Sequence, residues 1–199
     1  MKIIVATGNK HKLREIGEIL GKSRVTGRQS PVVENGKTFE KNAIKKVRAL
    51  KLAEDEIGLA DDSGLMVDCL GGKPGVRSAR FASPPTVGNL CGKLLKVMDV
   101  GRRTWDVGRG AKFVCVIAIK WPTGKIKTVK GICRGKIIEE MRGEHGFGYD
   151  PVFVPAGFKK TFAEMAPKTK NKISHRAQAL RKLKKLLYNA KSRARSSFG

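Results

Sequence analysis

Acidic residues are scarce in this chain of 199 residues, which contains 17 Asp and Glu against 42 Lys and Arg. No acidic residue follows Glu164, whereas Lys and Arg recur as far as Arg195. The formal net charge of +25 favours anionic partners, namely nucleic acid, anionic membrane or polyphosphate substrates, and predicts steeply salt-dependent binding. A solvated basic face with a frayed tail would explain the same composition without any such partner.

The chain also lacks the patterns of a membrane protein or a zinc site. No apolar run approaches the length that crosses a bilayer, and the first ten residues are too short and too soon polar for a signal peptide. The four cysteines form no CxxC pair, the three histidines are isolated, and no HExxH occurs. We therefore expect a cytoplasmic protein with reduced thiols, without a membrane partner and without zinc.

The spacing of apolar residues predicts an α/β fold. Residues 3–6 are expected to form a buried strand, and the continuous apolar stretch 113–119 a central one. Helices are predicted near Lys10, after the N-cap Thr38, at 89–98 and from about Ser174. Residues 127–133 would pair with the central strand across a turn, so the sheet should be mixed and flanked by helices.

One domain is the default for a chain of this length, because it can bury a sizeable core. Leu187 is the last well-patterned apolar residue. We therefore place the domain at residues 1–187 and a basic C-terminal tail at residues 188–199.

The segment Thr7-Gly8-Asn9-Lys10-His11-Lys12 joins the first predicted strand to the first predicted helix. Backbone N–H groups at the start of a helix point outward, and the helix dipole favours an anion there. Lys12, with Lys10, would add positive charge next to a phosphate. Many α/β proteins begin with a strand, a glycine turn and a helix, so this segment alone does not establish a phosphate site.

Two adjacent carboxylates are predicted where residues 59–60 end a strand and deliver Asp61-Asp62-Ser63-Gly64 into a loop. Adjacent carboxylates are costly unless they are solvated, paired or metal-bound. Mg²⁺ prefers oxygen ligands and keeps several waters, so one or two carboxylates plus substrate phosphates suffice, and Glu34 is a further candidate donor. An Asx-type turn at Asp62 would explain the same residues structurally.

Two further motifs each allow a functional and a structural interpretation. Gly146-Phe147-Gly148-Tyr149-Asp150-Pro151 would lay an aromatic ring against a base, or its aromatics would anchor a tight turn to the core. Ser174-His175-Arg176 presents a hydroxyl, an imidazole and a guanidinium together, or forms an ordinary exposed first turn of the last helix.

Taken together, the motifs resemble the inosine/xanthosine triphosphate pyrophosphatase family. The match covers nearly the whole chain, in the order ATGNKHK, TFEKNA, ADDSGL, LGGKPGVRSARF, FVCV, GFGYDPVF, KTFAEM and ISHRAQAL. The resemblance implies a nucleotide cleft between two lobes of a mixed sheet flanked by helices, usually in a homodimer. It also implies Mg²⁺-dependent hydrolysis of the non-standard purine nucleotides ITP, dITP and XTP to monophosphate and pyrophosphate.

The resemblance further implies a role for each motif residue. Thr7 to Lys12 would form the triphosphate-binding turn, and Lys46 would reach the phosphates from the second helix. Glu34 and Asp62 would bind Mg²⁺, with Asp62 also orienting or deprotonating the attacking water and Asp61 supporting it. The remaining candidate substrate contacts are Ser63, the base-binding loop of Phe147, Gly148, Tyr149 and Asp150, and the purine-edge group of Lys170, His175 and Arg176.

Two positions depart from the family pattern. Lys41 stands where the family commonly has Glu, so the capping box that Thr38 would begin is lost, at a stability cost below about 1 kcal/mol. His145 stands where many relatives have glycine, which leaves the conformation of its loop open.

Two other classes of function fit parts of the pattern. A nucleic-acid-binding protein that kept the fold without turnover would account for the charge, and weak nonspecific nucleic-acid binding through the basic surface and tail would also be compatible with an enzyme. A nucleotide-sensing or structural module would bind nucleotide without hydrolysing it. The retained carboxylates Glu34, Asp61 and Asp62 favour the enzyme.

Overall fold

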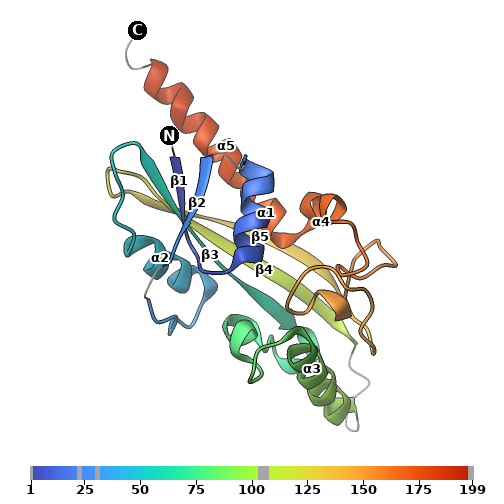
Figure 1. The fold of residues 1–199 in the computed structure, drawn as a ribbon. Coiled ribbons are helices and arrows are strands. Elements are labelled where there is room, and N and C mark those ends of the chain that lie inside the picture. Colours follow the sequence, from blue (N-terminus) through green and yellow to red (C-terminus); the bar gives the residue numbers. More distant parts are fainter. Residues whose placement is uncertain (1, 22–23, 30–31, 103–107, 197–199) are drawn as a thin grey trace. The chain divides into compact units, whose positions relative to one another are not determined.

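The computed structural model describes residues 2–21, 24–29, 32–102 and 108–196 (Figure 1). The strands are β1 (Lys2–Ala6), β2 (Val25–Arg28), β3 (Glu56–Val67), β4 (Gly110–Lys120), β5 (Ile126–Ile137) and β6 (Phe153–Pro155). The α-helices are α1 (Lys10–Leu20), α2 (Phe39–Arg48), α3 (Val87–Arg102), α4 (Pro167–Ile173) and α5 (His175–Ser196). Short 3₁₀ segments are η2 (Asp68–Leu70), η3 (Gly75–Arg80) and η4 (Asp150–Val152).

The six strands form one sheet in the order β2-β1-β3-β4-β5-β6. Strand β1 is parallel to both of its neighbours, and Ile3 lies opposite Val25 of β2 and Ile57 of β3. Strand β6 is antiparallel to β5. The predicted mixed sheet flanked by helices is therefore confirmed.

The chain divides into two compact units that are described separately below. Unit 1 comprises Met1–Asp62, Cys115–Gly131 and His175–Gly199, and unit 2 comprises Ser63–Val114 and Ile132–Ser174. In the described part of the chain, no helix combines the length and the apolar character needed to cross a membrane.

The core of unit 1 packs helices α1 and α5 against strand residues such as Val5 and Ile117. Helix α5 contributes Ala179, Leu180 and Leu183, which lie on one face because they are spaced by one and three residues. The start of α5 lies against β5 at Gly131, where an added Cβ would come within 2.0 Å of the His175 carbonyl oxygen. Only glycine permits this approach, which fixes where the first turn of α5 begins.

The core of unit 2 is built around helix α3 and three phenylalanines. Leu90, Leu94 and Met98 recur at helical spacing on α3, as the sequence predicts for residues 89–98. The rings of Phe113, Phe153 and Phe162 lie 4.8 to 5.9 Å apart between centroids. Tyr149 and Val152, which belong to the same core, hold the preceding glycine-rich loop against it.

The expectation that a strand ends at residues 59–60 is wrong. Strand β3 continues to Val67, so Asp61, Asp62, Ser63 and Gly64 lie within the strand and do not form an Asx-type turn. The two aspartates are buried, and basic side chains from other elements pair with both. Because that pairing offsets the desolvation of the carboxylates, the strand does not need to break where its apolar pattern ends.

The sequence did not predict helix α4 or the 3₁₀ segments. The predicted tail is helical as far as Ser196, since α5 runs to that residue, and residues 197–199 lie outside the described residues. The boundary at residue 187 stays a prediction. All four cysteines are free thiols, as expected.

Candidate active site

The turn from β1 to α1 is shaped by its own side chains. Asn9 is the N-cap of α1, and its Oδ1 accepts hydrogen bonds from the backbone N–H groups of His11 (3.0 Å) and Lys12 (3.1 Å). Thr7 Oγ1 accepts a hydrogen bond from the Asn9 N–H at 3.1 Å. Gly8, Asn9, Lys10 and His11 are exposed, and no acidic residue lies in the first turn of α1. The turn thus offers an anion a rigid, positively polarised helix start.

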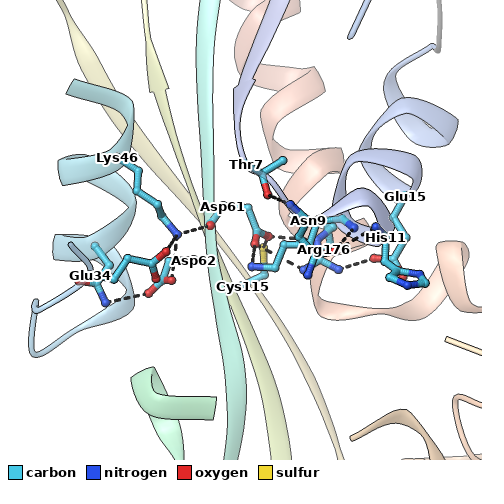
Figure 2. Close-up of polar contacts among 12 residues, drawn as sticks. Thr7, Asn9, His11, Glu15, Glu34, Lys46, Asp61, Asp62, Cys115 and Arg176 are labelled. Carbon is cyan, nitrogen blue, oxygen red and sulfur yellow. Dashed lines mark hydrogen bonds and ion pairs between the residues drawn. The ribbon is translucent and has the colours of Figure 1, made fainter. Parts of the chain in front are cut away.

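Asp61 lies at the centre of an ion-pair network in unit 1 (Figure 2). Its Oδ1 accepts from Lys12 Nζ at 2.5 Å, and its Oδ2 accepts from Arg176 Nε at 3.0 Å and from Cys115 Sγ at 2.9 Å. Burial raises the pKa of Asp61, but Arg176 and Lys12 outweigh it and hold the pKa well below its usual range. Asp61 is therefore a fixed anion that holds other groups in place and does not exchange protons near neutral pH.

The Arg176 guanidinium is almost completely buried, with 1% of its side chain exposed. Besides Asp61 it pairs with Glu15 of α1 through Nη1. The printed ion pairs link Arg176 to acidic side chains of its own unit, and its predicted role in base recognition stays a prediction. Glu15 was missed from the sequence, although it lies three residues after Lys12 on the same helix face.

Lys46 contacts both the backbone of Asp61 and the side chains of two nearby carboxylates. Its Nζ donates to the Asp61 carbonyl oxygen at 2.7 Å and pairs with Asp62 Oδ1 at 3.1 Å and Glu34 Oε1 at 3.2 Å. Burial lowers the pKa of Lys46, but the charges of Asp62 and Glu34 outweigh it and raise the pKa. A charged ammonium has three donors, and these contacts employ all of them.

Glu34 and Asp62 form a carboxylate pair around this one ammonium. Burial and a hydrogen bond with Glu34 raise the pKa of Asp62 to about 6, although Lys46 lowers it. Burial also raises the pKa of Glu34, but Lys46 and the hydrogen bond with Asp62 outweigh it and lower the pKa. The oxygen donors of the pair suit Mg²⁺.

No cluster of three or more His, Cys, Asp and Glu side chains able to hold a metal occurs among the described residues. A cation at Glu34 and Asp62 would therefore complete its coordination with water and substrate oxygens, as Mg²⁺ commonly does.

Asn42 is a second site residue that the sequence did not single out. Its Nδ2 donates to Asp62 Oδ2 at 3.1 Å, and its side chain is buried. Asn42 lies four residues before Lys46 in α2, so the two side chains reach Asp62 from the same face of the helix.

In unit 2, Asp150 organises the predicted base-binding loop. Its Oδ2 accepts from the Phe147 N–H at 2.8 Å and from Lys170 Nζ at 2.7 Å, and that ammonium lies 4.9 Å from the centre of the Phe147 ring. Gly146 has φ +82° and approaches Asp150 so closely that a Cβ would lie 2.1 Å from Oδ2. Asp150 and Lys170 therefore fix the backbone beside Phe147.

Tyr149 and Gly148 are also held by this unit. The buried Tyr149 hydroxyl donates to the Ser78 carbonyl oxygen at 2.9 Å, and Cys91 Sγ lies 3.4 Å from the Gly148 carbonyl oxygen. Tyr149 is thus an anchor to the core, as the structural interpretation of the loop predicts. The residues with positive φ in this loop are all glycines, and His145 is not among them. The replacement of the family's glycine by His145 therefore does not strain the backbone.

The structure places the predicted site residues in two groups. Unit 1 contains the turn at residues 7–12 together with Glu34, Lys46, Asp61, Asp62, His175 and Arg176. Unit 2 contains Ser63, the loop residues Phe147 to Asp150, and Lys170. The phosphate-binding and metal-binding candidates therefore share one unit, and the nucleotide cleft between two lobes stays a prediction.

Comparisons with known proteins agree with this arrangement of motifs. A sequence model of the Ham1 family matches residues 3–186. The dITP/XTP pyrophosphatase of Desulforamulus reducens is 46% identical over 94% of this chain and 96% of its own, and that of Bacillus subtilis is 44% identical over 92% and 96%.

Solved structures give the same result. A HAM1 protein from Coxiella burnetii superposes with a TM-score of 0.83 at 36% identity, covering 95% of this chain and 99% of its own. The Ham1 protein of Staphylococcus aureus has a TM-score of 0.80 at 34% identity, covering 96% and 100%. The chain belongs to the Ham1 family.

Proposed function

We propose that the protein hydrolyses the non-standard purine nucleotides dITP, XTP and ITP to the monophosphate and pyrophosphate, and so removes them from the nucleotide pool. The observation that carries this proposal is the cluster of the buried Lys46 and Asp62 with the partly exposed Glu34, which adjoins the Lys12–Asp61 pair of the α1 turn. It occurs in a chain 46% identical to a protein named dITP/XTP pyrophosphatase.

The chain offers groups for each part of a direct attack of water between the α- and β-phosphates. Asp62 is the candidate to orient or deprotonate the attacking water, because its carboxylate is held in place by Lys46 and Asn42. Lys12 and Lys46 would stabilise the departing pyrophosphate through their positive charge. A bound Mg²⁺ would neutralise charge on the phosphates, with Glu34 and Asp62 holding it.

The opposite faces of strand β3 separate these tasks. Successive side chains of a strand point to opposite faces, so Asp61 is directed toward Arg176 and Asp62 toward Glu34 and Lys46 (Figure 2). Because Asp61 stays ionised, it keeps Lys12 at the α1 turn, where an arriving triphosphate would compete for the ammonium. Asp61 thereby supports the site without taking part in proton transfer.

The dependence on Mg²⁺, the location in the cytoplasm and the homodimer belong to the same proposal and rest on the family resemblance. The Mg²⁺ dependence has additional support in the carboxylate pair, whose two oxygen-bearing groups share a single ammonium. The family resemblance also assigns contacts with the base to the Phe147 to Asp150 loop, Ser63, Lys170, His175 and Arg176, and these roles belong to the same proposal.

Weak nucleic-acid binding is a secondary proposal, favoured by the surface of helix α5. The exposed residues Arg181, Lys182, Lys184 and Lys185 follow one another along this helix, and the sequence contains no acidic residue after Glu164. Truncation after Leu187 should leave catalysis nearly intact, while DNA binding followed by fluorescence anisotropy weakens and its salt dependence becomes flatter. Equal retention of DNA by both forms at low salt would exclude residues 188–199 as the contact.

The test of the main proposal is release of pyrophosphate from dITP, XTP and ITP, with and without Mg²⁺, against dATP and dGTP as matched controls. We expect rapid release from the non-standard nucleotides only when Mg²⁺ is present. If the folded protein releases no pyrophosphate from any of them, it binds nucleotide or nucleic acid without turnover, and the enzyme proposal fails.

A further inference from the structure

We propose that Asn42 is a positioning residue that holds Asp62 and the segment bearing Glu34 in a fixed relation. This inference rests on the proposed function, since it assigns to Asn42 the task of orienting the base of that reaction. The side-chain hydrogen bonds of Asn42 go to Gly36 and to Asp62, so its influence on the reaction passes through Asp62.

The Asn42 side chain forms a hydrogen bond at each end of its amide. Its Oδ1 accepts from the Gly36 N–H at 2.7 Å, and its Nδ2 donates to Asp62 Oδ2 at 3.1 Å. The backbone N–H of Gly36 can only donate, so the oxygen of the amide must face Gly36 and its NH₂ must face Asp62. The orientation of the amide is therefore decided by its partners.

Gly36 is shaped for this contact. A Cβ at residue 36 would lie 2.5 Å from Asn42 Oδ1 and 3.1 Å from Lys41 Cβ, so a larger residue would have to push the amide aside. The absence of a side chain at Gly36 and the burial of the Asn42 amide are separate features that serve the same link.

Helix α2 connects to this segment at three points. Lys45 Nζ donates to Asn35 Oδ1 at 2.9 Å, Asn42 accepts from Gly36, and Lys46 pairs with Glu34. Only Asn42 and Lys46 also contact Asp62. Lys46 attracts both carboxylates by charge, whereas the amide bonds have a preferred direction, so Asn42 is the group that can set the plane of the Asp62 carboxylate.

A positioning role makes a specific prediction about kinetics. Removal of a group that orients a reacting carboxylate commonly costs about 10- to 100-fold in activity. In Asn42→Ala we expect kcat to fall by about that factor, while KM for dITP rises by a smaller factor, because Asn42 lies next to Asp62 and not at the α1 turn. Lys45→Ala is the matched control, since it removes a bond from the same helix to the same segment without touching Asp62.

A double-mutant cycle tests whether Gly36 acts through Asn42. Gly36→Ala should lower kcat in the parent, because its Cβ displaces the amide, but should have little further effect on kcat in Asn42→Ala, where no amide remains to be displaced. Lys45→Ala should instead have the same small effect in both backgrounds. Thermal melts of every variant establish the folded fraction at the assay temperature.

The outcomes separate this inference from the proposed function. If the parent itself does not turn over dITP, the proposed function has failed. If the parent is active, two results for folded Asn42→Ala would overturn the positioning role. The first is a kcat within about threefold of the parent value, and the second is a change in kcat and KM no different from that of Lys45→Ala. If Asn42→Ala does not fold, Gly36→Ala decides alone, because it moves the amide without deleting it, and an unchanged kcat then overturns the inference.

Discussion

The buried acidic sites of the two units differ in how fully their charge is balanced. In unit 2, Asp150 meets one ammonium from Lys170 and one backbone N–H from Phe147, so a single negative charge has a full partner. In unit 1, Glu34 and Asp62 share the one ammonium of Lys46. The first arrangement joins one carboxylate to one ammonium, whereas the second brings two carboxylates to the same ammonium, with the charge of Lys12 acting on both.

This difference indicates what each site does. A balanced buried pair fixes a backbone, and Asp150 holds a loop whose glycines approach it closely. Burial and the neighbouring Glu34 raise the pKa of Asp62, and the oxygen donors of this pair suit a divalent cation. The same residue type therefore acts as an anchor in one unit and as a candidate reactive group in the other.

The sharpest test of the comparison replaces one aspartate in each unit. Asp62→Asn should lower kcat by about 10²- to 10⁴-fold with the fold intact, because it removes the base and metal-binding charge without changing size. Asp150→Asn should instead raise KM more than it lowers kcat, since it loosens the loop. Steady-state kinetics on dITP measures both, and activity of Asp62→Asn within about threefold of the parent would show that the assignment of Asp62 is wrong.

The next largest effect is expected at Arg176. In Arg176→Lys the charge remains, but the bidentate contact with Asp61 and the pairing with Glu15 cannot both be kept. We expect the free energy of unfolding to fall by about 1–3 kcal/mol, because a buried carboxylate loses a hydrogen-bond partner, and urea denaturation measures the loss.

Two comparisons complete that experiment. A stability loss no larger than that of the exposed-site control Lys185→Ala would show that the network around Asp61 is not structural. The ratio of kcat/KM for ITP to kcat/KM for ATP tests the purine-edge role. If Arg176 recognises the base, its replacement should lower kcat/KM mainly for ITP.

The pH dependence of stability should differ between the parent and Asp62→Asn in the absence of metal. The folded pKa of Asp62 is raised from 3.8 to about 6, so its contribution to stability is fully present below pH 3.8 and is lost as the pH rises through 6. Relative to the parent, Asp62→Asn should therefore gain about 1–3 kcal/mol between pH 4 and pH 7. Urea denaturation in EDTA at both pH values measures it, and a pH-independent difference would contradict the raised pKa.

The smallest expected effect tests whether the α2 helix can be stabilised without affecting its site residues. Thr38 Oγ1 accepts from the Lys41 N–H at 3.1 Å, so half of a capping box already exists. Lys41→Glu should complete it and raise the free energy of unfolding by less than about 1 kcal/mol, with kcat unchanged. Thermal melts would show the gain as a higher melting temperature. A large change in kcat would mean that residue 41 affects the arrangement of Asn42 and Lys46.

The order of helices and strands could be predicted from local sequence patterns, because the formation of each element depends mainly on residues that are close in the chain. Thr38 as an N-cap, the apolar face of α3 at residues 89–98 and the central strand around 113–119 all follow from spacing within a few turns or residues. Helix α4 was not predicted because its seven residues show no helical spacing of apolar side chains. The end of β3 was predicted too early because adjacent aspartates are typical of a loop.

The sequence by itself determined the family motifs, the candidate residues that bind phosphate and metal, and the surplus of positive charge. Tertiary structure alone decided which cation meets which carboxylate. Arg176 meets Asp61 across 115 residues of chain and Glu15 across 161, and Asn42 reaches Asp62 only because α2 lies beside β3. Spacing along a helix or strand cannot encode such contacts, because they depend on how the elements pack together and on the desolvation that makes each charge require a partner.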